Sequence, residues 1–447
     1  MLSKSTTCIP TFIINLAHRR DRLENITKEF GKRNEFDVEV FPAVFRPENG
    51  ALGLWLTFKK IIEIARDRKL PFVLISEDDH KFTEVYNFKK LHHYIETAES
   101  TQADILLGGV SWFDFSTKIC EGLHWVNLFN GTQFLIVYDR FYDVILSFER
   151  FVENDNLDFV ISSLSNKKLV AFPFLSVQKN TGYSDITTGD NERQAIETLF
   201  SAASERFIAI ESVYKHIKSA DCVTSRHYYN EYQLSTYVIN TLEREDRLDS
   251  IQSQFFGKSE FNLKVLTSPR EYNGATGLWR NIKKAVSAAV ENDEDLILIC
   301  EDDHVFSANY DKFILFDSIF QGASLGAELI LGGISNYQQG IVATPNLIWV
   351  AGFQCTQFTI IFKSMFQKIL DVEFLDNDAA DLKLSNITSN KYVIHPFVSY
   401  QKNFGYSDIP INGVSTENYM EWFKGSESGL NFLRDITEKY IELNNEQ

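Results

Sequence analysis

Cysteine is scarce in this 447-residue chain. The five cysteines are Cys8, Cys120, Cys222, Cys300 and Cys355. Their number is odd, and they lack the short spacings typical of zinc ligands, which argues against a disulfide framework and a cysteine-based metal site. We therefore expect a reducing, cytoplasmic setting.

Positive charge is also in short supply. The chain has 44 Lys and Arg against 61 Asp and Glu, which gives a formal net charge of −17. Nonspecific nucleic-acid binding depends on a basic surface that displaces counterions, so this class of partner is disfavoured. A polyanionic ligand would need a metal ion or clustered arginines to be held by such a protein.

Long apolar runs are missing as well. None approaches the roughly 20 residues of a membrane span, and the apolar N-terminal stretch is too closely joined to the first expected strand to be a signal peptide. Core material is nevertheless plentiful, because 44% of the residues are hydrophobic and 14% aromatic. We expect a folded chain without a transmembrane segment.

The most informative pattern is a duplication. LISEDDHKF (residues 74–82) returns as LICEDDHVF (298–306), so that Glu77 and Glu301 are 301 − 77 = 224 positions apart, about half of the chain. Repeats are sought before any local assignment because they determine the architecture. Further aligned pairs are TFIINLAHRRDRL (11–23) with TYVINTLEREDRL (236–248), NGALGLW (49–55) with NGATGLW (273–279), DILLGGVS (104–111) with ELILGGIS (328–335), Thr132-Gln133 with Thr356-Gln357, and SVQKNTGYSDI (176–186) with SYQKNFGYSDI (399–409).

Two long copies joined head to tail predict two domains of one kind. Each copy is long enough for its own core. We expect domain boundaries of 1–220 and 221–447, with the polar stretch 219–234 as the linker.

Strand and helix patterns alternate along each copy. In the first, residues 11–16 and 72–76 are short apolar runs, while 54–69 is amphipathic at the helical period. A continuous apolar run is typical of a strand covered on both faces, and such alternation predicts a parallel sheet between helices. We expect an α/β fold with two tandem Rossmann-like domains and mostly parallel sheets. The other expected elements of the first copy are 19–32, 86–97, 140–150, 157–165 and 191–218 as helices and 37–44, 104–109, 134–138 and 169–174 as strands.

Acidic residues follow the apolar run at 72–76 in the first copy and the equivalent run in the second. Ligands of open α/β sheets bind beyond the carboxyl ends of strands, and hard oxygen donors suit Mg²⁺ or Mn²⁺ better than Zn²⁺. Alternation along an extended chain predicts that Glu77 and Asp79, like Glu301 and Asp303, point together. Each pair is a candidate site for a metal ion that bridges the diphosphate of a nucleotide. The alternative is a helix cap or a solvated acid, and the recurrence in both copies favours the metal. His80 and His304 are equally well explained as ligands or as hydrogen-bonded loop residues.

Arginines follow the first expected strand of each copy. Arg19 and Arg22 recur as Arg244 and Arg247, at the start of a helix where anions are already favoured. They are candidate phosphate ligands. Asp21, which recurs as Asp246, is expected to cap that helix or to accept a hydrogen bond from a ribose.

The order of these motifs resembles glycosyltransferase family 25, the lipopolysaccharide and collagen galactosyltransferase group with the GT-A fold. The likeness is carried by INLAHRRDR (residues 14–22), a glycine-containing helix, and a hydrophobic strand ending in Glu-Asp-Asp. It implies a nucleotide-sugar donor, a UDP-sugar by preference, with a divalent metal and inversion at the anomeric carbon. The acceptor would be a hydroxyl group on a glycan or another molecule. The resemblance places Asn15, Arg19, Asp21, Arg22, Asn240, Arg244, Asp246 and Arg247 beside the nucleotide, and Glu77, Asp79, Glu301 and Asp303 on the metal.

Inverting transfer needs a base that takes the proton of the attacking hydroxyl. The resemblance favours Asp158 and its counterpart Asp381, each at the start of a short helix, whereas the plain reading of Asp158 is a helix cap. Asp185 and Asp408 are the other paired acids. They follow Gln178 and Gln401 on a polar loop that is expected to cover the diphosphate or to supply a further ligand.

Two other functions fit the same residues. A nucleotide-sugar-binding scaffold with one or both domains inactive would bind donor without turnover. A metal-dependent hydrolase would transfer the sugar to water alone. Because neither copy has lost its acids, we expect both domains to be active.

Overall fold

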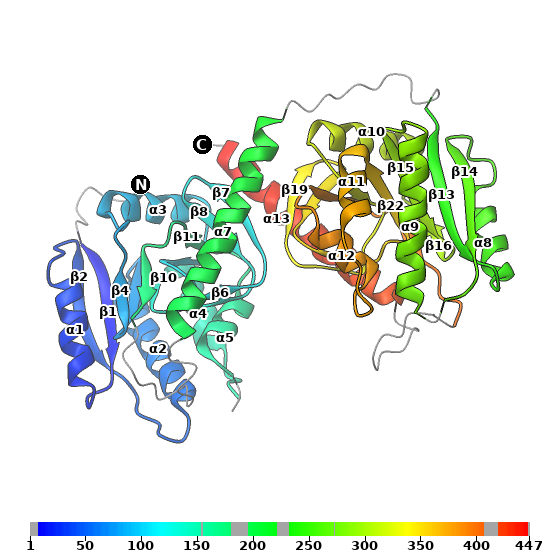
Figure 1. Cartoon of the computed structure of the whole chain (residues 1–447). Coiled ribbons are helices and arrows are strands. Elements are labelled where there is room, and N and C mark those ends of the chain that lie inside the picture. The colour runs from blue at the N-terminus through cyan, green and yellow to red at the C-terminus, as the bar shows by residue number, and fades with distance from the viewer. Residues whose placement is uncertain are drawn as a thin grey trace. The chain divides into compact units, whose positions relative to one another are not determined.

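The computed structural model of the chain (Figure 1) describes residues 8–152, 155–179, 195–220, 232–271, 273–405 and 419–445. The chain divides into two compact units. Unit 1 comprises residues 1–213 with 437–447, and unit 2 comprises residues 214–436. Within the described ranges, no helix combines the length and apolarity that a membrane crossing requires.

Unit 1 is built on an eight-stranded sheet with the strand order β2-β1-β3-β10-β5-β11-β8-β7. The pairings show that β10 and β8 run opposite to the other six strands. The strands are β1 (Ile9–Asn15), β2 (Phe36–Pro42), β3 (Phe72–Glu77), β5 (Ile105–Leu107), β7 (Ser116–Cys120), β8 (Leu123–Val126), β10 (Phe134–Tyr138) and β11 (Lys168–Ala171), with the small pairs β4 (His80–Phe82) and β12 (Ser176–Gln178), and β6 (Trp112–Phe113) and β9 (Phe129–Asn130).

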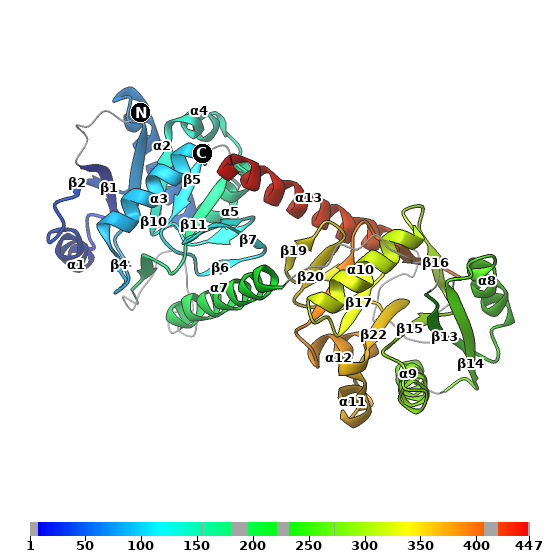
Figure 2. The same cartoon turned by 90° about the horizontal axis from the view of Figure 1, so that it is seen from above.

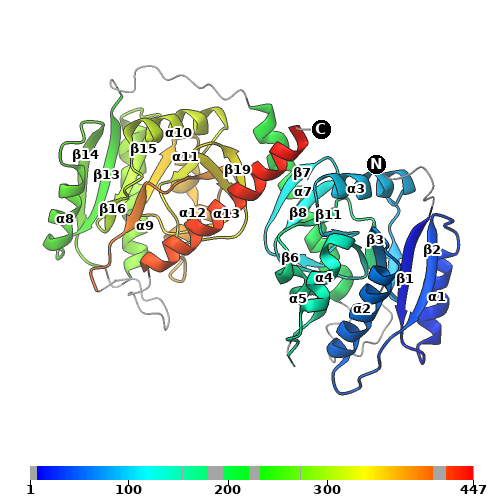
Figure 3. The same cartoon turned by 180° about the vertical axis from the view of Figure 1, so that it is seen from behind.

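Helices connect these strands. The connections from β1 to β2 and from β2 to β3 run in opposite directions along the sheet, so right-handed crossovers place α1 and α2 on opposite faces (Figure 2). The helices α2, α4 and α5 contact one another and lie together in Figure 3. The helices are α1 (Arg20–Phe30), α2 (Gly50–Asp67), α3 (Phe88–Ser100), α4 (Asp139–Ser147), α5 (Leu157–Leu164) and α7 (Ala195–Ser219).

Unit 2 repeats this topology, with the strand order β14-β13-β15-β22-β17-β23-β20-β19. The predicted α/β class, with two Rossmann-like domains and mostly parallel sheets, is confirmed. The strands are β13 (Leu234–Thr241), β14 (Phe261–Ser268), β15 (Leu296–Glu301), β16 (His304–Phe306), β17 (Leu329–Leu331), β18 (Asn336–Tyr337), β19 (Gly340–Thr344), β20 (Leu347–Val350), β21 (Phe353–Gln354), β22 (Phe358–Phe362), β23 (Lys391–Ile394) and β24 (Ser399–Gln401); the helices are α8 (Glu245–Phe255), α9 (Gly274–Glu291), α10 (Lys312–Ser324), α11 (Lys363–Asp371), α12 (Ala380–Asn386) and α13 (Tyr419–Asn445).

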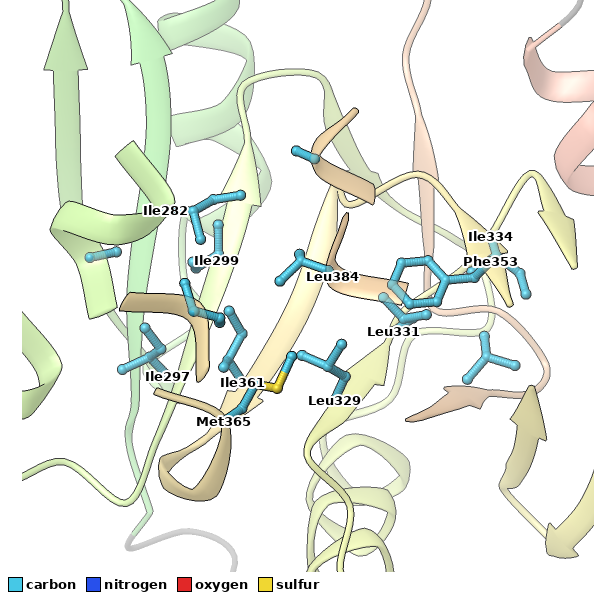
Figure 4. Packing of buried hydrophobic residues seen from close by; sticks show 14 of the residues in the cluster. Ile282, Ile297, Ile299, Leu329, Leu331, Ile334, Phe353, Ile361, Met365 and Leu384 are labelled. Carbon is cyan, nitrogen blue, oxygen red and sulfur yellow. The ribbon is translucent and has the colours of Figure 1, made fainter. Parts of the chain in front are cut away.

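The core of unit 2 lies between its sheet and the helices α9, α11 and α12. Figure 4 shows Ile299 and Ile361 from neighbouring strands packed beside Ile282 and Met365 from two of these helices. Truncating one such buried side chain to alanine typically costs about 2–5 kcal/mol. β15, the strand that ends in Glu301, is therefore anchored in this core through Ile297 and Ile299.

The carboxyl ends of β1 and β3 meet at the edge where the site lies. In their parallel register Ile14 is opposite Glu77, so the residues that follow both strands are neighbours. The antiparallel strand β10 enters beside them, with Phe134 opposite Ser76. The chain just before β10 therefore also borders the acids.

Candidate active site

The central acid of each Glu-Asp-Asp motif is held by the arginine motif. Asp78 is buried; its Oδ2 accepts a hydrogen bond from Asn15 Nδ2 at 2.9 Å, and its Oδ1 accepts one from Arg22 NH1 at 3.0 Å. Arg19 NH1 lies 3.8 Å from the same Oδ1. Asp78 is thus paired with an asparagine and two arginines from within the protein.

Unit 2 reproduces this arrangement. Asp302 accepts hydrogen bonds from Asn240 Nδ2 at 3.2 Å and from Arg247 NH1 at 2.9 Å, and Arg244 NH1 lies 3.8 Å from its carboxylate. The same guanidinium of Arg247 is 3.4 Å from Asp303. Duplication of the whole network indicates that it supports the fold of the site in both units.

The arginines differ from the sequence-based picture in their surroundings. Arg22 and Arg247 are almost fully buried, at 3% and 4% exposure, because each crosses from its helix to the acidic turn. Arg19 and Arg244 precede α1 and α8 as their N-terminal caps. Asp21 and Asp246 are exposed in the first turns of these helices.

Glu77 is linked to Asp158 through a threonine. Thr132 Oγ1 lies 2.7 Å from Glu77 Oε1 and 3.1 Å from Asp158 Oδ1. The backbone N–H of Gly131 donates to Asp158 Oδ2 at 2.6 Å. The structure therefore brings the predicted metal motif and the predicted base into one hydrogen-bonded cluster.

In unit 2 the corresponding cluster is similar but not identical. Thr356 Oγ1 donates to Glu301 Oε1 at 2.6 Å, and the backbone N–H of Cys355 donates to Asp381 Oδ2 at 3.0 Å. Cys355 Sγ lies 3.0 Å from Ser335 Oγ. A thiol therefore stands beside the acids where unit 1 has a glycine.

Burial raises the pKa of the first and third acid of each Glu-Asp-Asp motif. Burial, and then the charges of Asp79 and Asp158, raise the pKa of Glu77 to about 8. Burial and the charge of Asp78 raise the pKa of Asp79 to about 6, although Arg22 opposes this. Burial and the neighbouring acids raise the pKa of Glu301 to about 8 and that of Asp303 to about 6. Crowded carboxylates behave in this way when no cation compensates them.

A divalent cation fits this pair of acids. The buried atoms Asp79 Oδ1 and Asp303 Oδ1 accept no hydrogen bond from the described residues. Over the same residues, no group of three or more His, Cys, Asp or Glu side chains is arranged to hold a metal. Mg²⁺ is commonly held by only one or two carboxylates, with substrate phosphates and water completing the coordination. In each unit one acid of the pair therefore has an open oxygen atom, which suits a metal that arrives with a phosphate ligand.

The two histidines of the motifs begin the short strands β4 and β16, and each has a serine partner. His80 Nδ1 is 2.7 Å from Ser176 Oγ, and His304 Nδ1 is 2.7 Å from Ser399 Oγ. Burial lowers the pKa of each ring to about 3, so both are neutral. They join the acidic turn to β12 and β24.

The polar loops after β12 and β24 begin beside the acids. The backbone N–H of Lys179 donates to the carbonyl of Asp79 at 2.7 Å, and in unit 2 Gln401 Nε2 donates to Asp303 Oδ2 at 2.8 Å. Gln178 occupies the place of Gln401 at the end of β12. Asp185 and Asp408 lie outside the described residues.

A cavity of about 830 Å³ opens over the acids of unit 2. Glu301, Asp303 and Asp381 all line it, which brings the candidate metal ligands and the candidate base to one space. Other lining residues are Arg244, Arg247, Ser335, Asn336, Gln354, Cys355, Leu382, Gln401 and Trp422. A volume of this size is in the range of small-molecule sites.

Sequence reasoning missed two features of the site. The partners of Asp78 and Asp302 were not predicted, although the recurrence of the asparagine and the second arginine in both copies was visible. Thr132 and Thr356 were seen to recur without a role being assigned to them. In both cases the recurrence of these residues in the two copies was the signal that could have revealed them.

Comparisons with known proteins give distant likenesses. No family model matches the chain, and no curated protein matches it. One similar structure is the mannosyltransferase PcManGT from Pyrobaculum calidifontis in complex with GDP-Man and Mn²⁺, with 12% identity over 48% of this chain and 66% of that one and a TM-score of 0.25. Another is a UDP-glucose pyrophosphorylase complexed with UDP-glucose, with 10% identity over 43% of this chain and 80% of that one and a TM-score of 0.27. A third is A197 from STIV, with 14% identity over 38% of this chain and 86% of that one and a TM-score of 0.27. Likeness at this level does not decide the activity of this chain.

Proposed function

We propose that each unit is a metal-dependent glycosyltransferase that moves a sugar from a nucleotide-sugar, preferably UDP-linked, to an acceptor hydroxyl with inversion. The observation that carries this proposal is the partly buried acid pair Glu77 and Asp79 at the end of β3, which recurs as Glu301 and Asp303 at the end of β15, each beside a third acid. The resemblance of the sequence motifs to glycosyltransferase family 25 points the same way. The proposed domains are residues 1–220 and 221–447.

The residues divide into two groups by charge. Glu77 and Asp79 would hold Mn²⁺ or Mg²⁺ in unit 1, and Glu301 and Asp303 would do so in unit 2. The bound cation would neutralise the charge that develops on the departing diphosphate. Arg19 and Arg244, at helix N-termini where anions are favoured, are the arginines best placed to attract the diphosphate.

The base is proposed to be Asp158 in unit 1 and Asp381 in unit 2. Burial raises the pKa of Asp158, which makes its carboxylate a better proton acceptor. The hydrogen bond from the Gly131 N–H, together with the contact of Thr132 Oγ1 at 3.1 Å, fixes the orientation of the carboxylate. Asp158 would take the proton of the acceptor hydroxyl as that oxygen attacks the anomeric carbon.

A thermal-shift panel of nucleotide-sugars, run with Mn²⁺ and with EDTA, tests this proposal. We expect a UDP-sugar to stabilise the protein only when the metal is present. Product analysis then separates the three functions. Transfer to an added acceptor supports the proposal, release of free sugar indicates a hydrolase, and stabilisation without turnover indicates a scaffold. Equal stabilisation in EDTA would remove the metal from the mechanism.

A further inference from the structure

An exposed aromatic pair lies on the surface of unit 1. Trp112, in β6, is 37% exposed, and Phe159, in α5, is 40% exposed. Their ring centroids are 5.9 Å apart in an edge-to-face arrangement, with an interplanar angle of 79°. Two large aromatic side chains that touch each other and still face solvent form an apolar patch that a ligand would cover.

This pair borders the candidate base. Phe159 directly follows Asp158, and Trp112 is paired in register with Asn130, the residue before Gly131. Gly131 is the residue whose N–H donates to Asp158. The aromatic pair is therefore connected to the reaction centre through two short backbone paths.

The equivalent positions of unit 2 confirm that this part of the fold faces the site. Asn336 and Leu382 replace Trp112 and Phe159, and both line the cavity that also contains Asp381. The same location thus holds two aromatic side chains in unit 1, and one amide and one aliphatic side chain in unit 2.

We propose that Trp112 and Phe159 form the acceptor subsite of unit 1, where the C–H face of a hexopyranose ring stacks on the indole. This inference rests on the proposed glycosyltransferase function. A pyranose presents an apolar face with hydroxyl groups at its edge, which matches an aromatic ring beside a hydrogen-bonding carboxylate. Unit 2, with an asparagine in place of the indole, would bind a different acceptor.

The position of the pair assigns it to the acceptor rather than to the donor. The contacts run from Glu77 through Thr132 to Asp158, and the next residue, Phe159, touches Trp112. The metal-side acids, which would receive the donor diphosphate, are therefore at one end of this path. The aromatic pair is at the other end, beyond the base that the acceptor hydroxyl must reach.

The test uses the full chain and three variants. Trp112→Asn and Phe159→Leu convert each position to its unit 2 counterpart. Phe88→Ala is the control, because Phe88 is similarly exposed (38%) but lies on α3. Saturation-transfer NMR with methyl β-galactopyranoside, methyl β-glucopyranoside and methyl α-mannopyranoside measures sugar binding without turnover. UDP alone is measured in parallel.

We expect at least one methyl hexoside to receive saturation at its ring C–H protons. Trp112→Asn should weaken that binding about tenfold, whereas Phe88→Ala should leave it unchanged. Phe159→Leu should weaken it less, since Leu keeps an apolar contact. Unchanged hexoside binding in Trp112→Asn, or no saturation of any hexoside in the unaltered protein, would overturn the inference. So would a selective loss of UDP binding, which would place a nucleobase on the ring.

Transfer assays separate this inference from the proposed function. If the protein transfers sugar, Trp112→Asn should raise the KM for the acceptor about tenfold and leave the KM for the donor unchanged. If transfer fails altogether but hexoside binding still depends on Trp112, the subsite stands and the function fails. If transfer occurs with an unchanged acceptor KM, the function stands and the subsite is wrong.

Discussion

The two units keep the same acidic cluster but differ in what surrounds it. Asp78 and Asp302 have the same asparagine and arginine partners, and Glu77 and Glu301 both accept from a threonine. The residues on the far side of the base are replaced. Constancy on the metal side and variation beyond the base are what two enzymes would need if they share donor chemistry and act on different acceptors.

A second difference lies directly beside the candidate base. Gly131 has a φ of +128° in unit 1, and its counterpart Cys355 has a φ of +82°, a conformation that side chains rarely adopt. The site of unit 2 therefore accepts backbone strain in order to place a thiol beside Ser335 and Asp381. Burial raises the pKa of that thiol, so it is a neutral group that fills space rather than a nucleophile.

The largest expected effect comes from removing one acid from each unit. Asp79→Asn and Asp303→Asn keep the shape of the side chain but remove a candidate metal ligand. We expect each to reduce one transfer reaction at least about 100-fold and to spare the other, because we propose a separate metal site in each unit. Assays of each sugar addition, run separately, measure this.

Glu63→Gln, on an exposed part of α2, is the matched control and should leave both activities intact. If Asp79→Asn stops every transfer and Asp303→Asn stops none, unit 2 is a scaffold. The comparison between the units would then be one between an enzyme and its inactive copy.

A smaller but still large effect is expected from the buried arginines. Arg22→Ala leaves Asp78 buried with fewer partners, and breaking such a pair typically costs about 3–5 kcal/mol. We expect a loss of this size in the free energy of unfolding, measured by urea titration, and the same for Arg247→Ala. Arg20→Ala, which removes an exposed arginine, should change stability little. Full stability of Arg22→Ala with weak donor binding would instead make Arg22 a phosphate ligand.

The smallest effect concerns the hydrogen bonds that hold the long helices α7 and α13 in place. Glu211 of α7 accepts hydrogen bonds from His124 Nε2 at 2.8 Å and Lys118 Nζ at 2.6 Å, whereas Glu427 of α13 accepts from the N–H of Phe397 at 2.8 Å and Tyr400 OH at 2.6 Å. Burial raises the pKa of Glu211, but its hydrogen bonds outweigh burial and lower it to about 2.

The folded-state pKa of Glu211 is thus below its ordinary value of 4.5. Its contribution to stability is fully present above pH 4.5 and is lost as the pH falls toward 2. We expect Glu211→Gln to cost about 1 kcal/mol at pH 7 and progressively less below pH 4.5. Urea titrations of the two proteins between pH 2.5 and 7 measure the difference. If the difference in the free energy of unfolding stays constant with pH, the charge of Glu211 does not stabilise the packing of α7.

Much of this architecture was predictable because apolar patterning is local. The run at residues 72–76 and the amphipathic stretch at 54–69 correspond to β3 and α2, within a few residues at each end. The direction of β10 was not predictable, because an apolar strand has the same composition whether it runs parallel or antiparallel. The short hairpin of β7 and β8 was missed since its residues show no clear alternation.

The candidate site was predictable in part for a related reason. Repetition identified Glu77, Asp79 and Asp158, but it does not say which side chains touch. Asp78 illustrates the gap. Its expected direction, away from its neighbours, follows from strand alternation, while its contact with Arg22 spans 56 positions and depends on the tertiary fold.

The glycines that follow β5 and β17 leave no room for a side chain, so mutations at these positions should be harmful. A Cβ atom at Gly109 would collide with the backbone carbonyl of Ser176, and one at Gly333 with that of Ser399. Neither carbonyl yields easily, because each belongs to a strand whose continuation bonds the backbone of Asp79 or Asp303. A random mutagenesis screen for lost activity should therefore recover substitutions at both glycines, although neither has a reactive group. Such a screen would identify the acidic turns through residues that have no side chain.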